Sequence, residues 1–448
     1  MSQRQGESGT AMVSDIAAPQ PTFRELVATS ARIGVLSFGG PAGQIALMHR
    51  VYVEEKRWID ESRYLSALNF CMLLPGPEAM QLATYIGWRL HGVAGGLAAG
   101  LLFVIPGALV VLALSMLYAA FGKVPLVEAV FVGVKAAVLA IVVEALIRVA
   151  RRALKTRVAW GIAAIAFVAI FVFAVPFPVI VLAAALVGFF ALGQAPAEAG
   201  AGSVPLANAH RDEVTPAGTL ATILVWLAIW VVLLAAIAAI CGRGHVLTEI
   251  GWFFSKLAVV TFGGAYAVLA YMAQDVVEVY GWLSPGEMLD GLGLAETTPG
   301  PLILVTEFVG YLAGLRQGGW AMGLAGALVT LWATFAPCFL WIFAGAPYIE
   351  RLNRMPRLKG ALAGVTAAVV GVILNLTVWF ALHVLFTHVP VLTNGPVKMH
   401  VPDWPTLDVR AVGLAVLAVV LLLVLHRGVL TTLAVCGAVA LGLKVALG

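Results

Sequence analysis

The chain has 448 residues, of which 61% are hydrophobic and 11% are charged, and its formal net charge is +4 at pH 7. Soluble domains carry about 25% charged and about 45–50% apolar residues, so this composition excludes a soluble protein and indicates one that lies within a lipid bilayer. The small charge gives no indication of nucleic-acid binding. The four cysteines are scattered, which argues against a disulfide framework or a zinc site.

Apolar segments follow one another along almost the whole chain. A spanning helix needs roughly 20 apolar residues, and lipid forces each segment to satisfy its own backbone, so helix is expected. We predict an all-α polytopic membrane protein with thirteen segments, near residues 26–48, 64–88, 93–121, 126–149, 158–174, 177–192, 219–241, 250–272, 286–313, 319–346, 360–386, 411–426 and 428–447.

The sequence repeats itself. FGG at 38–40 recurs 224 residues later at 262–264, and PGP at 75–77 recurs at the same offset at 299–301. Ordered matches of this kind predict two homologous halves. The predicted organisation is a disordered cytoplasmic tail (1–22), a first transporter repeat (23–192), a cytoplasmic linker (193–217), a linking transmembrane helix (218–242) and a second repeat (243–448).

The offset between the halves changes along the chain. A glycine pair at 95–96 matches one at 318–319 at offset 223, whereas Gly133 matches Gly364 at offset 231. An insertion near 325–337 would account for the change.

Loop charges predict that the halves are inverted. Each half has six segments and one helix links them, so the second half enters the membrane from the other side. The loop at 148–157 carries five basic residues and the loop before it has only Lys123, whereas in the second half the earlier loop, 351–359, carries four and 387–409 has only Lys398. The positive-inside rule then places the N-terminus in the cytoplasm and the C-terminus outside, in a bacterial inner membrane.

Each half also contains two segments with a helix breaker near the middle. If the first two segments span, four basic residues between 50 and 63 lie outside, against the rule. Re-entrant hairpins remove this conflict, because legs of ~11 residues reach about half the membrane. Broken spanning helices remain the alternative.

Four such breaks, two in each half, predict a binding site near the membrane midplane. Half-helix N-termini present free N–H groups and a positive dipole end to an anion. The alternative is that these residues only shape kinks. The predicted substrate-binding residues at the breaks are Ser37, Gly39, Gly40, Gln44, Pro75, Gly76, Pro77, Gln81, Thr261, Gly263, Gly264, Thr297, Thr298 and Gly300.

Basic residues within the apolar segments are further candidates. Arg32 and Lys256 match at offset 224, each six residues before its FGG motif, and would give both halves a cation on an anion pathway. The alternative is a side chain that snorkels to the interface. Lys135 is a secondary candidate that either binds anion or pairs with Glu144.

Three acidic residues in apolar segments are candidates for proton coupling, because a carboxylate in a dry site binds a proton more readily. They break the symmetry, since Glu78, Glu296 and Glu307 have no acidic counterpart in the other half. The alternative is an ion pair with Arg32, Lys256 or Arg89.

Motifs of enzymes are missing from the sequence. There is no Walker A, HExxH, GxSxG or Rossmann glycine pattern in a plausible setting. We therefore predict neither an enzyme nor a resident cofactor or metal, and the lack of a P-loop argues against ATP-driven pumping by this chain alone.

The sequence resembles the chromate ion transporter (CHR) family in its long, two-domain form. The residues that carry the resemblance are LSFGGPAGQIALM (36–48), KRWID (56–60), LLPGPEAMQLATYIGWRLHG (73–92), VVTFGGAYAVLAYM (259–272) and ETTPGPLILVTEFVGY (296–311). The second half departs from the first, with Ala265 in place of Pro41 and Val268 in place of Gln44, so the halves need not bind equally.

The resemblance implies a secondary transporter that exports chromate, with sulfate as its chemical analogue, and that confers chromate resistance. Membrane potential, proton exchange or both would drive it. Proton-coupled uptake of sulfate or molybdate is the alternative. The oligomeric state stays open, with a homodimer as one alternative.

Overall fold

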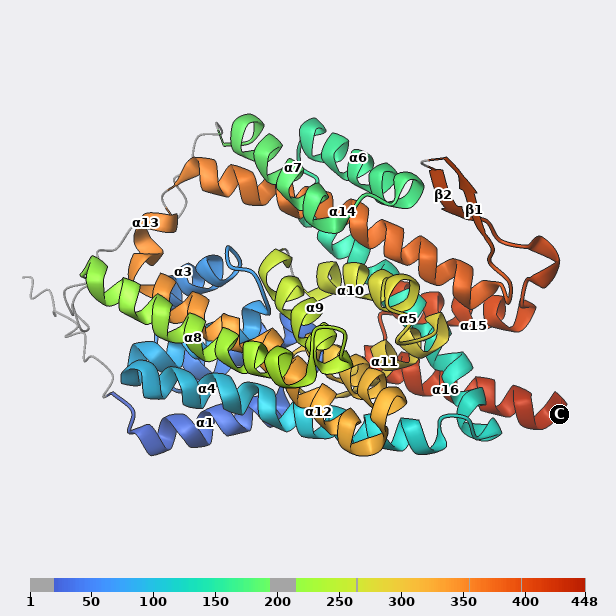
Figure 1. The fold of residues 1–448 in the computed structure, drawn as a ribbon, viewed down its shortest axis with the longest axis horizontal. Coiled ribbons are helices and arrows are strands. Elements are labelled where there is room, and N and C mark those ends of the chain that lie inside the picture. The colour runs from blue at the N-terminus through green and yellow to red at the C-terminus, as the bar shows by residue number, and fades with distance from the viewer. Residues whose placement is uncertain (1–19, 194–214, 263–264, 354, 396, 448) are drawn as a thin grey trace, which may run out of the picture.

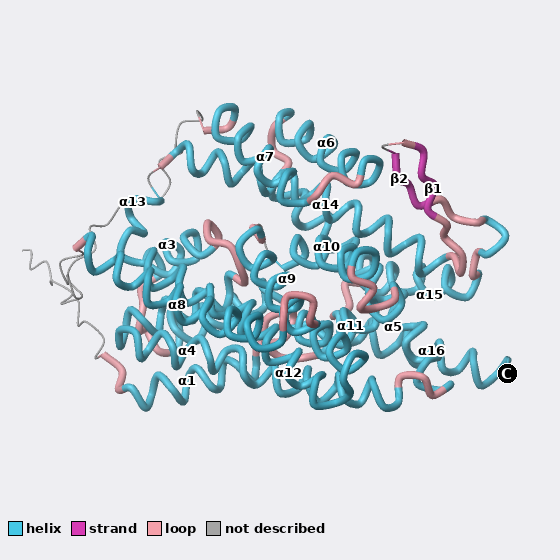
Figure 2. The backbone as a smooth tube through the Cα atoms, viewed as in Figure 1, coloured by secondary structure: helices cyan, strands magenta, loops and turns pink. Residues whose placement is uncertain are grey.

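The computed structural model describes residues 20–193, 215–262, 265–353, 355–395 and 397–447. Most of the predicted tail and linker, together with Gly263 and Gly264, lie outside these residues. The regular elements of the described part are helices, apart from one antiparallel hairpin formed by β1 (Val391–Asn394) and β2 (Val397–His400) (Figure 2). Long helices run along the longest axis, with α13 near one end and the hairpin near the other (Figure 1).

The first half and the connecting helix precede the second half in the chain. The first half consists of α1 (Phe23–Leu36), α2 (Gly40–His49), the π-helical turn η1 (Arg50–Glu55), α3 (Glu61–Cys71), α4 (Glu78–Phe121), α5 (Pro125–Ala153), α6 (Arg157–Phe173) and α7 (Phe177–Ala191). The helix α8 (Pro216–Cys241) lies between the halves.

The second half repeats this order. It consists of α9 (Val246–Val260), α10 (Ala265–Gln274), η2 (Asp275–Val279), α11 (Pro285–Thr297), η3 (Leu302–Leu304), α12 (Val305–Gly345), η4 (Ala346–Tyr348), α13 (Ile349–Asn353), α14 (Pro356–Leu385), β1, β2, η5 (Trp404–Thr406), α15 (Val409–Val419), η6 (Val420–Val424) and α16 (Val429–Leu447).

Helix starts follow local sequence signals. Thr22 and Glu25 form a capping box on α1, and Ser284 and Glu287 form one on α11, so each box satisfies backbone N–H groups that the first turn leaves free. At the first FGG motif, Gly39 has φ +84° and Pro41 lies in the first turn of α2. A left-handed glycine followed by a proline ends one helix and starts the next.

Six helical stretches in the described residues are long and apolar enough to cross a membrane, and three shorter helices are apolar. The chain is thus a polytopic helical membrane protein, but the predicted segments do not become thirteen spanning helices. The segment at 26–48 is divided into α1 and α2, and the one at 64–88 into α3 and the start of α4, because their breakers interrupt the helix.

Both long helices that follow a PGP motif contain a turn. The position of this turn corrects the predicted match between the two glycine pairs. His91 and Gly92 leave the helical conformation within α4, and Gly318 and Gly319 do so within α12. The predicted match of 95–96 with 318–319 is therefore wrong, since 95–96 is helical and Gly92 is the counterpart of Gly319. Gly92 and Gly319 both have the positive φ that the turn requires, +60° and +73°, whereas Gly95 and Gly96 do not.

Packing between the halves shows that they are inverted. The second parts of α4 and α12 are equivalent helices, each with an internal proline, Pro106 and Pro337. Gly96 lies against the ring of Phe343 and Gly100 against that of Phe339, so these equivalent helices run antiparallel. The halves also exchange helices: α6 and α7 pack on α14 of the second half, and α15 and α16 pack on α5 of the first.

Candidate anion-binding site

The breaks of the two halves meet through the backbone. The Gly76 N–H donates a hydrogen bond to the Thr261 carbonyl at 3.0 Å, and the Gly300 N–H donates to the Ser37 carbonyl at 2.8 Å. Each bond joins the PGP motif of one half to the end of the helix before the FGG motif of the other. The breaks are therefore assembled around one pseudo-symmetric centre.

A small cavity lies among these breaks. Its lining consists of Pro41, Gln44, Pro77, Glu78, Ala79, Ala265, Pro301, Leu302 and Ile303. These residues lie in or next to the first turns of α2, α4, α10 and η3. The first N–H groups of a helix lack intrahelical partners and mark its positive end, so these helix starts favour an anion nearby, whereas an ionised Glu78 in the lining would oppose it.

Two buried glutamines brace the breaks. Gln44 Nε2 donates to the Gly300 carbonyl at 2.6 Å, which links the halves, and Gln81 Nε2 donates to the Pro75 carbonyl at 2.7 Å. Within the described residues, Oε1 of each amide is buried without a partner. Each amide thus fixes a PGP loop through its Nε2, while its Oε1 remains an unsatisfied acceptor.

The predicted hydroxyls bond to their own helices. Ser37 Oγ donates to the Ile33 carbonyl and Thr261 Oγ1 to the Leu257 carbonyl. Thr298 Oγ1 likewise donates to the carbonyl three residues before it, and so does the exposed Thr297. None of the four lines the cavity.

The predicted basic residues lie away from the cavity lining. Arg32 lies 3.5 Å from Glu55 and its side chain is 58% exposed, while Lys256 Nζ lies 5.3 Å from the centre of the Tyr271 ring. Both occupy helices that lead to a break, so they remain predictions for the pathway rather than for the cavity.

Lys135 pairs with Asp290 at 3.5 Å, so its predicted alternative pairing with Glu144 is wrong. Glu144 instead pairs with Arg148. Lys135 and Glu144 lie nine residues apart on α5, and at 3.6 residues per turn this spacing places them on opposite faces.

The three carboxylates have different surroundings. Glu78 lines the cavity at the start of α4, Glu296 accepts a hydrogen bond from Tyr266 OH at 2.8 Å, and Glu307 is 1% exposed. No ion pair within the described residues joins any of them to Arg32, Lys256 or Arg89. The predicted alternative of such an ion pair is therefore wrong.

Sequence reasoning missed three polar residues: Tyr118, Tyr266 and Asp290. Tyr118 OH donates to Asp290 Oδ2 at 2.8 Å, and Asp290 is 4% exposed. An acidic residue inside the apolar segment 286–313 was the available signal for Asp290.

Two inverted halves with broken helices that meet at a cavity between them are typical of membrane transporters. Comparison with known families agrees with this class. The sequence profile described as "Chromate transporter" matches residues 24–189 and 248–443, one region in each half. The chain therefore belongs to the chromate transporter family, and the resemblance to its long two-domain form is confirmed.

Several relatives match over most of their length. The chain is 32% identical to a chromate transport protein of Cupriavidus metallidurans over 83% of this chain and 86% of the relative. It is 34% identical to a chromate transport protein of Pseudomonas aeruginosa, over 86% of this chain and 87% of that one. An uncharacterized transporter of Methanocaldococcus jannaschii is 23% identical over 81% of this chain and 85% of its own length. No solved structure matches the chain.

Proposed function

We propose that this protein transports chromate and exports it through the cavity between the four breaks. The observation that carries the proposal is the convergence of four helix starts on one small space. A tetrahedral oxyanion presents several acceptor oxygens, and free backbone N–H groups around it satisfy them from different directions. We choose chromate as the substrate because two relatives that match over most of their length are named chromate transport proteins.

Membrane potential supplies enough energy for export. One charge that crosses 100 mV gains about 2.3 kcal/mol, so a dianion that leaves a negative-inside cell gains about twice that. Proton exchange is an additional source. Export across a bacterial inner membrane, with a cytoplasmic N-terminus, would confer chromate resistance.

Re-entrant hairpins are part of the proposal. In the first half, Ser30 Oγ lies 3.4 Å from Tyr52 OH, across the break from it. In the second half, the ring of Phe253 contacts those of Tyr271 and Tyr280. These contacts support a chain that doubles back after each FGG motif. Arg32 and Lys256 then lie on the hairpin legs, where they would attract an anion toward the breaks.

Flux in liposomes tests the substrate and the direction. We expect saturable chromate movement when a potential alone is imposed, and inhibition by sulfate as the analogue. Sulfate or molybdate flux that requires a pH gradient, with chromate a poor substrate, would instead support proton-coupled uptake. Chromate flux that stays at the level of protein-free liposomes under both gradients would overturn the proposal.

Glu78 provides a test of proton coupling at the cavity itself. An ionised carboxylate in the lining repels a dianion, so we expect Glu78→Gln to lower the KM for chromate about tenfold at neutral pH. In the parent protein, flux should fall as pH rises, because deprotonation of Glu78 restores the repulsion. The variant should lose this dependence. Glu128→Gln, on an exposed position of α5, is the control, and an unchanged KM and pH profile in Glu78→Gln would exclude a role for this carboxylate.

A further inference from the structure

Equivalent hairpin helices of the two halves differ in burial. α10 and α11 are mostly buried, whereas α2 and α3 are mixed and also contain exposed and half-buried residues. Leu65 of α3 and Leu289 of α11 are equivalent positions at offset 224, yet the first is 45% exposed and the second 0%. The two halves therefore share a fold and differ in conformation.

Packing explains the difference in burial. α10 packs against α14, and α11 packs against α5 and α14. Within the described residues, neither α2 nor α3 packs extensively against α5 or α14, although inverted symmetry would allow it. We call the side on which α11 packs against α5 and α14 the closed side, and the opposite side, on which α3 packs against α4 and α13 instead, the open side.

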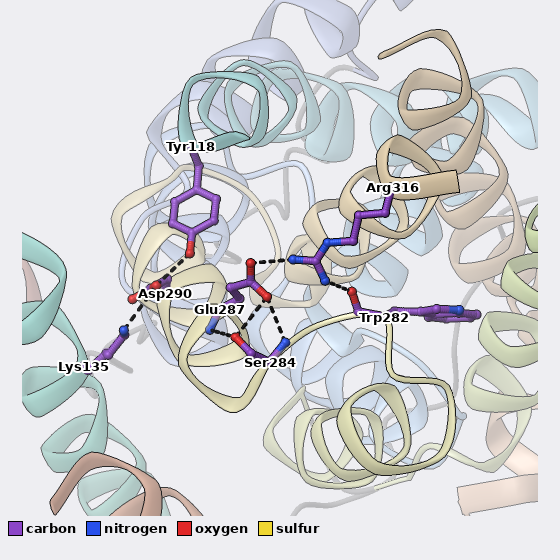
Figure 3. A network of polar contacts seen from close by, with 7 residues as sticks. All are labelled: Tyr118, Lys135, Trp282, Ser284, Glu287, Asp290 and Arg316. Atoms are coloured by element: carbon purple, nitrogen blue, oxygen red, sulfur yellow. Dashed lines mark hydrogen bonds and ion pairs between the residues drawn. The ribbon is translucent and has the colours of Figure 1, made fainter. Parts of the chain in front are cut away.

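A partly buried polar network lies on the closed side (Figure 3). Asp290 of α11 accepts a hydrogen bond from Tyr118 at the end of α4 and lies 3.5 Å from Lys135 of α5. Tyr118 and Lys135 belong to the first half and Asp290 to the second, so the network ties the halves together. Nearby, Arg316 of α12 binds Glu287 and the Trp282 carbonyl, which fixes the start of α11.

The equivalent positions on the open side cannot form this ion pair. The residues equivalent to Asp290, Lys135 and Tyr118 are Ser66, Thr366 and Ile349. None of them carries a charge, so the repeat has acquired an ion pair on one side only. A structural requirement of the fold would apply to both halves, whereas a device that favours one conformation needs only one.

We infer that Tyr118, Lys135 and Asp290 form a latch that holds one face of the transporter closed while the face formed by α2 and α3 is open. The inference rests on the proposed function, in which two inverted halves alternate around a central site. Transport would require α11 to leave Lys135 and Tyr118 while α3 closes against α14. The loop charges make the latched face the external one.

Cysteine accessibility tests the latch without a transport assay. Leu65→Cys and Leu289→Cys are introduced separately into the full chain after its four native cysteines are replaced by alanine. Vesicles of each orientation are treated with a membrane-impermeant maleimide. We expect Leu65→Cys to react from the cytoplasmic side and Leu289→Cys to be protected from both sides.

Breaking the latch should reverse this pattern. With Asp290→Asn or Lys135→Met, we expect Leu289→Cys to react from the external side about tenfold faster or more, since a buried charge that loses its partner is unfavourable. Leu65→Cys should become protected. The exchange of charges in Lys135→Asp with Asp290→Lys should restore protection of Leu289→Cys, and the exposed Glu128→Gln should leave both rates unchanged.

Two results would overturn the latch: an unreactive Leu65→Cys in the parent, which means that α3 faces lipid, or a Leu289→Cys rate that neither latch variant changes. If the charge-exchanged protein restores protection of Leu289→Cys, misfolding of Asp290→Asn cannot explain the faster labelling in that variant. Expected labelling in a protein that moves no chromate would uphold the latch and remove the substrate assignment.

Discussion

Chromate flux should fall by about 100-fold in Gly300→Ala, because a small displacement at a positioned site has effects of this size. Gly300 has φ +90°, a conformation that alanine adopts only with strain. An added Cβ would lie 3.0 Å from Leu304 Cδ1 and 3.3 Å from the Gly107 Cα. The PGP loop would have to move, and with it both the Gly300 N–H that binds Ser37 and the carbonyl that binds Gln44. The initial rate of potential-driven chromate uptake into liposomes measures the effect.

Gly319→Ala is the matched control for Gly300→Ala. Gly319 also has a positive φ, +73°, so the backbone penalty of about 1–3 kcal/mol is comparable. No atom lies within 4 Å of a Cβ added there, and the turn in α12 is not part of the cavity lining. We expect Gly319→Ala to keep most of its flux. Equal losses in the two variants would show that backbone strain, rather than the PGP loop at the cavity, sets the rate.

The duplicated architecture was accessible from the sequence because its signals are local and repeated. FGG and PGP combine residues that interrupt helices, and their recurrence at one offset reveals two halves without any knowledge of contacts. The same signals indicated where the chain breaks. The structure places Gly76 against Thr261 and Gly300 against Ser37, as expected for breaks that converge.

Partners of individual side chains were not accessible in this way. Lys135 and Asp290 are 155 residues apart in the chain, and no pattern around either residue specifies the other. Arg32 was predicted to serve the anion pathway, and its pairing with Glu55 depends on how η1 folds back beside α1. The glycine match at 318–319 failed for a related reason, since residue identity alone does not show which glycine pair adopts the turn conformation.

Unfolding of the transporter should be the main effect of Gly100→Leu. Gly100 lies where α4 crosses α12, and an added Cβ would lie 2.4 Å from Thr84 Oγ1 and 2.8 Å from the Phe339 ring. Overpacking costs typically 1–3 kcal/mol and occasionally more. Here the loss of stability should reach or exceed about 3 kcal/mol. The new leucine side chain would meet the first part of α4 on one side and the second half of the protein on the other, so it could not move aside. We expect a strongly reduced yield of monodisperse protein and a lower Tm in detergent.

Gly161→Leu is the control for this prediction. Gly161 lies on α6 with open space around it, so a leucine there should leave the Tm unchanged. A second comparison separates the two neighbours of Gly100. Gly100→Ala should destabilise the protein, and adding Phe339→Leu should recover part of the loss, because it removes the ring on the side of the second half. If Phe339→Leu brings no recovery, the contact with Thr84 within α4 alone limits this position. A normal Tm for Gly100→Leu would mean that α4 and α12 are not in close contact, and the inverted packing of the two halves would have to be redrawn.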